Sequence, residues 1–149
     1  DGCALLLDGA PVIGVSGRGK RLDKVLFTIF HEVAHVLLGH LNATDGAIAD
    51  DLSVPGDDRW EQEADALAGS LAIAGPLPEV PGLITKRWVD VTAERLDVHP
   101  IVLIGRLQKK GQIPWRTTLV RDAPSAVPHL EQWEMPLPIT GSASVDSQT

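Results

Sequence analysis

The chain has 149 residues, of which 44% are hydrophobic, and its 13 Lys and Arg against 20 Asp and Glu give a formal charge of −7. This length suits one domain with an apolar core, and the hydrophobic content argues against a chain that is disordered throughout. The acidic balance argues against a broad basic surface for nucleic acids, and no apolar run approaches the roughly 20 residues that span a bilayer. The single cysteine, Cys3, excludes an internal disulfide and fits the reducing cytoplasm, where we expect this protein to act.

The chain opens at Asp1 without an initiator methionine or a signal-type segment. We expect it to be a fragment of a longer protein, and the upstream part is a candidate to carry part of the function. Within the fragment, residues 1–140 are predicted to form one domain. The polar residues 141–149 are predicted to form a disordered tail.

Turn chemistry and apolar periodicity predict a β-hairpin followed by a helix. The apolar runs at residues 3–7 and 12–16 flank the sequence Asp-Gly-Ala-Pro, which is typical of a turn between two strands. A helix is predicted over residues 22–38, and Gly39 is suited to end it. The apolar stripe of this helix, at spacings of three and four, consists of Leu22, Leu26, Ile29, Val33 and Val36.

Three further helices are predicted, at residues 59–74, 84–96 and 100–109. Asp58 is a suitable N-cap for the first of them, and a proline at the first position opens the last. Residues 42–56 are expected to form a polar, turn-rich connection, and the C-terminal part is punctuated by prolines. This pattern indicates an α+β domain in which several helices lie beside a small antiparallel sheet.

The segment most informative about function is an HExxH motif, His31-Glu32-Val33-Ala34-His35, inside the first predicted helix. Residues four apart share a helix face, so both imidazoles can reach one metal ion. Glu32 is offset by about a third of a turn, which places its carboxylate beside an open coordination position rather than on the metal. Zinc with three protein ligands keeps that position for water and lowers the pKa of the water. Glu32 can then act as a general base and pass the proton to the leaving amine.

A third ligand is expected from the second predicted helix, where Glu61 and Glu63 compete. Glu61 is preferred because it shares a stripe with small residues that would let this helix approach the histidines closely. Glu63 lies on another stripe and is a candidate solvated or capping charge, and Glu61 itself could serve only in a capping box with Asp58. Asp65 can accept a hydrogen bond from the non-ligating nitrogen of a zinc histidine and so fix the orientation of its ring.

Two segments together resemble the ImmA/IrrE family of zinc metallopeptidase-like domains. Residues 27–40, FTIFHEVAHVLLGH, are similar to the family's FTxxHExxHxLLGH helix, and residues 60–68, WEQEADALA, are similar to its Glu-x-x-Ala-Asn/Asp-x-Phe-Ala signature. Asp65 occupies the Asn/Asp place, whereas Leu67 stands where the family usually has Phe, a mild departure at a packing position. HExxH alone is shared by many zincins, but the two segments together are much more specific. The resemblance covers roughly residues 1–115.

The resemblance implies a gluzincin-like core in which His31, His35 and Glu61 bind one zinc ion and Glu32 is the base. It implies a cytoplasmic endopeptidase that cleaves a repressor-type transcriptional regulator, or a domain fused behind a helix-turn-helix. Several members of the family resemble antitoxin or phage-control regulators. The alternative is therefore a non-catalytic zinc-binding module that mediates protein interaction or sensing, with a DNA-binding domain upstream of Asp1.

Three other features have simpler interpretations. Residues 14–20 match G-x-x-x-x-G-K, but Arg21 replaces the Ser or Thr that would hold Mg²⁺, so a solvated loop is favoured over a nucleotide site. His40 lies five residues after His35, about 140° around a continuing helix, so a structural or surface position is expected. His99 precedes a helix-opening proline and is expected to cap that helix or lie at the surface.

Overall fold

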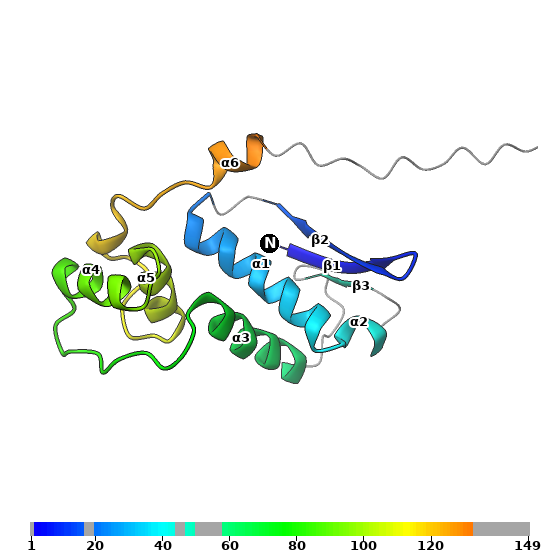
Figure 1. Cartoon of the computed structure of the whole chain (residues 1–149), viewed down its shortest axis with the longest axis horizontal. Coiled ribbons are helices and arrows are strands. Elements are labelled where there is room, and N and C mark those ends of the chain that lie inside the picture. The colour runs from blue at the N-terminus through cyan, green and yellow to red at the C-terminus, as the bar shows by residue number, and fades with distance from the viewer. Residues whose placement is uncertain (1, 17–19, 44–46, 50–57, 133–149) are drawn as a thin grey trace, which may run out of the picture.

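The computed structural model describes residues 2–16, 20–43, 47–49 and 58–132. In this part of the chain the helix α1 runs through the middle of the molecule, beside a small sheet (Figure 1). The α+β class predicted from the sequence is confirmed. In chain order the elements are β1 (Gly2–Leu7), β2 (Ala10–Val15), α1 (Leu22–Leu37), α2 (His40–Ala43), β3 (Ala47–Ala49), α3 (Asp58–Ala72), α4 (Lys86–Arg95), α5 (Pro100–Lys109), η1 (Thr118–Val120) and α6 (Val127–Glu131).

β1 and β2 form the predicted hairpin, and β3 completes an antiparallel sheet of order β2-β1-β3. The turn is shorter than predicted because it consists of Asp8 and Gly9 alone, whose φ angles are +51° and +79°. A two-residue turn with positive φ at both positions matches the twist of the flanking strands, and it sets Leu7 opposite Ala10. Pro11 therefore belongs to β2, an edge strand of the described sheet, where a missing N–H is tolerated.

α1 is the central element and has nearly the predicted bounds. It packs against β1 and β2 on one side and against α3 on another (Figure 1). The helix ends because Gly39 takes a φ of +75°, a left-handed conformation that glycine adopts without steric cost. The N–H of Leu38 donates to the carbonyl of Ala34, and the N–H of Gly39 donates to that of Val36.

The later helices agree with the predictions except at their ends. α3 begins one residue earlier than predicted and ends two residues earlier. Asp58 is therefore the first helical residue instead of the N-cap, and the residue before it lies outside the described ranges. α4 begins after Thr85, whose hydroxyl accepts a hydrogen bond from the N–H of Trp88. α5 has the predicted bounds, and Nδ1 of His99 caps it by accepting from the N–H of Ile101.

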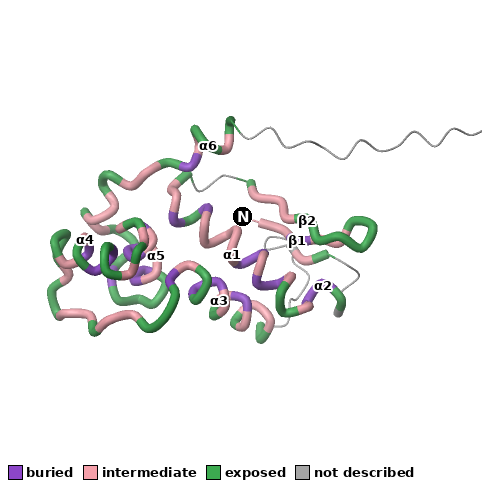
Figure 2. Tube along the Cα trace, in the orientation of Figure 1, coloured by how far each residue is buried: buried purple, intermediate pink, exposed green. Residues whose placement is uncertain are grey.

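The main apolar cluster is built by α4, α5 and the residues that follow α3 and α5. Figure 2 shows buried residues in these helices and along α1 and α3, whereas the tip of the β1–β2 hairpin is exposed. The buried polar side chains at the C-terminal half of α1 lie outside this cluster. The buried members of the apolar cluster are Ile73, Val89, Ala93, Ile101, Leu103, Ile104, Leu107 and Ile113.

Some elements and boundaries were not predicted. α2 and β3 overlap the connection expected at residues 42–56, and η1 and α6 lie in the proline-punctuated part. β3 pairs with β1 through distant residues, for example Ala4 opposite Ile48, and no local pattern reveals such pairing. The predicted tail at 141–149 lies outside the described residues. Within the described part, no helix combines the length and the apolar character needed to cross a membrane.

Candidate metal centre

His31 and His35 lie one turn apart on α1 and direct their Nε2 atoms at each other. The two Nε2 atoms are 3.0 Å apart, and the ring centroids are 4.7 Å apart. Both residues are buried, with 8% and 1% of their surface exposed. The spacing of the HExxH motif thus places both rings on one face of the helix, as predicted.

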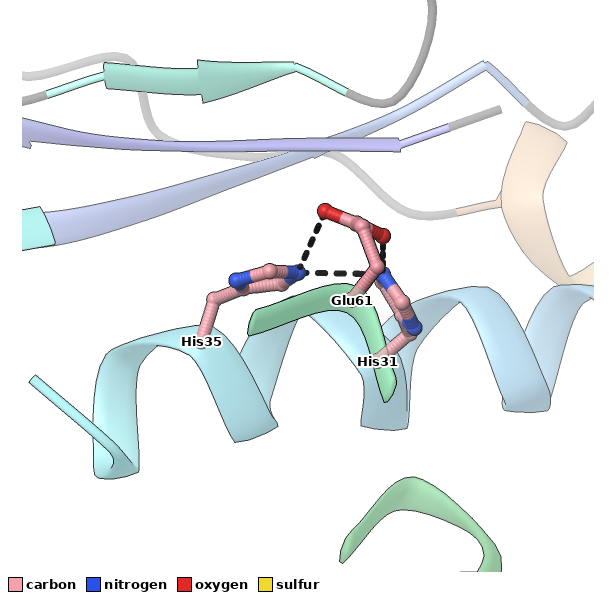
Figure 3. A group of neighbouring side chains, drawn as sticks. All are labelled: His31, His35 and Glu61. Atoms are coloured by element: carbon pink, nitrogen blue, oxygen red, sulfur yellow. Dashed lines mark hydrogen bonds and ion pairs between the residues drawn. The ribbon is translucent and has the colours of Figure 1, made fainter. Parts of the chain in front are cut away.

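α3 brings Glu61 to the two histidines (Figure 3). Its Oε2 is 3.1 Å from Nε2 of His31, and its Oε1 is 3.4 Å from Nε2 of His35. The helices approach closely because Ala64 and Ala68, both small and fully buried, lie on the same stripe of α3 as Glu61. Ligand-type atoms from two helices therefore converge at one point.

Glu63, the competing candidate, is not part of this group. Its Oε1 accepts a hydrogen bond of 2.8 Å from Arg59, and its Oε2 is 3.5 Å from Nε2 of His40. The hydrogen bond from Arg59 holds the pKa of the Glu63 carboxyl below its usual value. Glu63 is therefore an ionised residue beside the group.

The second ring nitrogen of His31 faces a carboxylate. Its Nδ1 lies 3.1 Å from Oδ1 of Asp65, the residue that the sequence suggested for this position. A carboxylate only accepts hydrogen bonds, and each ring nitrogen of His31 faces one at 3.1 Å, so a metal ion bound at Nε2 would leave the proton of a neutral ring on Nδ1, where Asp65 accepts it. Oδ2 of Asp65 is 2.9 Å from Nζ of Lys109, so an ion pair from α5 holds the carboxylate in place.

The second ring nitrogen of His35 faces another imidazole. Its Nδ1 lies 2.9 Å from Nδ1 of His40, which is also buried. Burial, with smaller contributions from the neighbouring His31 and His40, lowers the pKa of His35 from its usual value to about 4. His35 is therefore neutral at pH 7, which is the form that binds a metal.

The donor set fits a divalent metal ion. Nε2 of His31, Nε2 of His35 and a carboxylate oxygen of Glu61 all lie within 4.8 Å of one another. Two ligands at about 2.0–2.1 Å from a tetrahedral zinc ion are about 3.3 Å apart, close to the separations here. With the proton of His31 on Nδ1, the lone pair of Nε2 faces the Glu61 carboxylate, and a cation between them would stabilise this arrangement.

Glu32 follows His31 on α1 but lies outside the three-residue group. It is 1% exposed, and its carboxylate lies against Gly2 at the start of β1, where a Cβ would collide with Oε1 of Glu32 and with the side chain of Thr28. The absent side chain of Gly2 thus makes room for the carboxylate. Glu32 is placed between α1 and the sheet and not among the ligand-type atoms.

A small cleft of about 160 Å³ opens beside the group. Nζ of Lys109 lies 5.0 Å from the centroid of the Phe27 ring at this cleft, so a cation and an aromatic face form part of the wall. The group can therefore be reached from solvent on this side. The residues that line the cleft are Phe27, Thr28, His31, Glu61, Asp65 and Lys109.

A family model described as the IrrE N-terminal-like domain, of the M78 peptidases, matches residues 4–79, just over half of the chain. The chain belongs to this family. Both signature segments lie inside the match, which confirms the resemblance seen in the sequence. The match stops before α4, whereas we expected the resemblance to extend to about residue 115. Neither the comparison with curated proteins nor that with solved structures yields a match.

Two neighbours of the site in this IrrE-like domain were missed by sequence reasoning. The position expected for His40 was that of a residue in a continuing helix. The chain instead turns at Gly39, which places the His40 imidazole against the ring of His35. Lys109 comes from α5, far along the chain, and no local pattern connects it with Asp65. The signal that could have found His40 is the helix-ending glycine directly before it.

The P-loop-like segment at residues 14–20 has the wrong surroundings for a nucleotide site. The strand before it, β2, belongs to an antiparallel sheet and not to a parallel βαβ unit. Arg21 donates hydrogen bonds to Asp23 and Gln108, which ties this end of α1 to α5. Residues 17–19 lie outside the described ranges.

Proposed function

We propose that this chain is a zinc-dependent endopeptidase that hydrolyses a peptide bond in a repressor-type regulatory protein. The observation that carries the proposal is the convergence of His31, His35 and Glu61 between α1 and α3. Family membership supplies the reaction class, because the chain is a metallopeptidase-like domain.

The choice of metal rests on the donor set. Two imidazole nitrogens and one carboxylate suit zinc, and a site with three protein ligands leaves one position open for catalysis. Manganese and iron accept similar donors, and we propose zinc because it suits a tetrahedral nitrogen and oxygen site with one open position. When bound, zinc would supply a Lewis acid for the peptide carbonyl and make the attacking water more acidic.

Glu32 is the proposed general base. Its carboxylate takes a proton from the attacking water and delivers it to the nitrogen of the leaving amine, which balances the hydrolysis. Its burial between α1 and β1 removes competing bulk water from the carboxylate. Asp65 and Lys109 keep the ring of His31 in the orientation that directs Nε2 at Glu61.

The edge of the sheet offers a place for the substrate backbone. β2 is an edge strand of the described sheet, and its Val15 lies opposite Gly2, the residue in contact with Glu32. An extended peptide that pairs with β2 would therefore run past the end of the sheet where Glu32 lies. The regulatory nature of the substrate follows from the resemblance to the ImmA/IrrE family.

The test compares the wild-type chain with Glu32→Gln on a peptide library read by mass spectrometry, each protein loaded with one equivalent of Zn²⁺. Both proteins are expected to hold zinc, and the variant is expected to cleave about 10²–10⁴-fold more slowly because it lacks the base. Equal cleavage by the two proteins would contradict the role of Glu32. Zinc binding without any cleavage by the wild type would favour a non-catalytic interaction or sensing module.

A further inference from the structure

His40 has a buried imidazole whose position the proposed reaction does not explain. It is 5% exposed and is the first residue of α2, immediately after the turn at Gly39. Its Nδ1 is 2.9 Å from Nδ1 of His35, and the two rings meet edge to face. A buried side chain in direct contact with a proposed metal ligand can fix the orientation of that ligand and the position of its proton.

Only one proton fits between two ring nitrogens at this distance. If both nitrogens carried a proton the donors would repel, and if neither did the lone pairs would repel. Either His35 donates to His40 or His40 donates to His35. The first case leaves the lone pair of a neutral His35 on Nε2, facing His31 and Glu61, whereas the second places the proton there.

Nε2 of His35 faces Oε1 of Glu61 at 3.4 Å, so without a metal each case gives one ring nitrogen a carboxylate to donate to, whereas a metal ion bound at Nε2 of His35 would select the first case. The far side of His40 fits that case. Its Nε2 faces Oε2 of Glu63 at 3.5 Å, and a carboxylate favours a proton on the nitrogen that faces it. Glu63 is itself held by the 2.8 Å hydrogen bond from Arg59, and the ring of Trp60 stacks on His40 at 5.1 Å with an interplanar angle of 13°. α3 thus fixes both the plane of the His40 ring and the side that carries its proton.

We propose that His40 is a positioning residue that, oriented by Glu63, accepts the proton of His35 Nδ1 in a hydrogen bond and thereby directs the lone pair of His35 Nε2 at His31 and Glu61. The site then has two parallel arrangements, with Asp65 behind His31 and the His40–Glu63 pair behind His35. α3 supplies the carboxylate in both. The tautomer of His35 and the effect on metal binding rest on the proposed function, whereas the contact between the two Nδ1 atoms does not.

The tautomer can be observed directly in the full chain. The chain has five histidines, so ¹⁵N NMR of the imidazoles gives a simple spectrum in which protonated and bare ring nitrogens differ strongly in chemical shift. In the Zn²⁺-loaded wild type at pH 7, His35 is expected to carry its proton on Nδ1 and none on Nε2, and His40 is expected to have a bare Nδ1 that accepts from His35. A proton on Nε2 of His35 or on Nδ1 of His40 would overturn the proposal.

Zinc affinity, measured by competition with a chelator, tests the consequence. His40→Leu removes the acceptor and is expected to weaken Zn²⁺ binding by about 10–100-fold, because the loss of a hydrogen-bond partner of a metal ligand typically has an effect of this size. His40→Asn offers an amide oxygen near the place of Nδ1 and is expected to restore most of the affinity. His129→Leu removes an exposed histidine on α6 and serves as the matched control, with wild-type affinity expected.

The outcomes separate this proposal from the proposed function. Wild-type affinity in His40→Leu, or an Asn variant as weak as the Leu variant, would overturn the positioning role while leaving the zinc site intact. A wild-type chain that binds no zinc would instead contradict the proposed function and, with it, the positioning role of His40. If His40→Leu fails to fold, the wild-type spectrum and the Asn variant carry the test.

Discussion

At the scale of single residues, α3 assigns different tasks to two glutamates that are only two positions apart. Glu61 meets both Nε2 atoms of the HExxH histidines, whereas Glu63 points to Arg59 and His40. Two positions on a helix differ by about 200° in direction, so the two carboxylates cannot serve the same point. Glu61 is therefore the proposed metal ligand, whereas Glu63 lies behind His40 and outside the ligand group.

The pair of glutamates gives a direct prediction. Glu61→Gln removes a charged donor from the group and is expected to lower zinc affinity by at least about 100-fold. Glu63→Gln keeps an amide oxygen for His40 and is expected to change the affinity far less. Chelator competition on both variants measures the difference. Similar losses in the two variants would mean that Glu61 is not the ligand.

The residues at the site were partly predictable. His31, His35, Glu61 and Asp65 follow from helical spacing, because each relation depends only on which residues share a face. His40 did not follow, since its position depends on the turn at Gly39, and a single glycine changes the direction of the chain.

At the scale of elements, β1 packs directly on the proposed base. The contact depends on Gly2, because any Cβ at this position would meet Oε1 of Glu32 and the methyl group of Thr28. The hairpin therefore contacts the Glu32 side chain as well as packing on α1. It defines the space in which the Glu32 carboxylate lies.

Gly2→Val tests this contact. The larger side chain is expected to displace the Glu32 carboxylate and so reduce peptide cleavage, while zinc affinity stays near that of the wild type because no ligand-type atom moves. Gly82→Val is the matched control, since a Cβ at Gly82 meets nothing within 4 Å. Full cleavage by Gly2→Val would show that the packing of β1 does not position the base.

The elements with local signals were the ones that the sequence predicted. The hairpin has its Asp-Gly turn, α1 has its apolar stripe and its glycine, and α5 has the His-Pro start. β3 has three residues and pairs with β1 across more than forty residues of chain. Its existence depends on tertiary contact and not on propensity, so no local pattern predicts it.

At the scale of the whole molecule, α5 connects the apolar core to the site. Leu107 is fully buried in the core cluster, and two residues later Lys109 forms the ion pair with Asp65. Arg21 and Gln108 also link the start of α1 to α5. α5, which lies outside the family match, therefore supports the site through contacts that only the folded chain reveals.

Leu107→Ala is expected to destabilise the fold by about 2–5 kcal/mol, because it leaves a cavity among α4 and α5. Chemical denaturation of the metal-free protein measures this loss of unfolding free energy. Leu83→Ala, at a side chain that is 77% exposed, is the control and is expected to change stability by no more than about 0.5 kcal/mol. Equal effects of the two changes would contradict the assignment of the core.

The proposed function depends on His31, His35 and Glu61 holding one metal ion between α1 and α3. Elemental analysis of the wild-type chain and of His31→Ala, each purified, loaded with Zn²⁺ and desalted in parallel, tests this most directly. We predict one zinc ion per wild-type chain and a large loss of zinc from a variant that remains folded by circular dichroism. A wild type without zinc, or a folded variant that holds as much zinc as the wild type, would contradict this prediction.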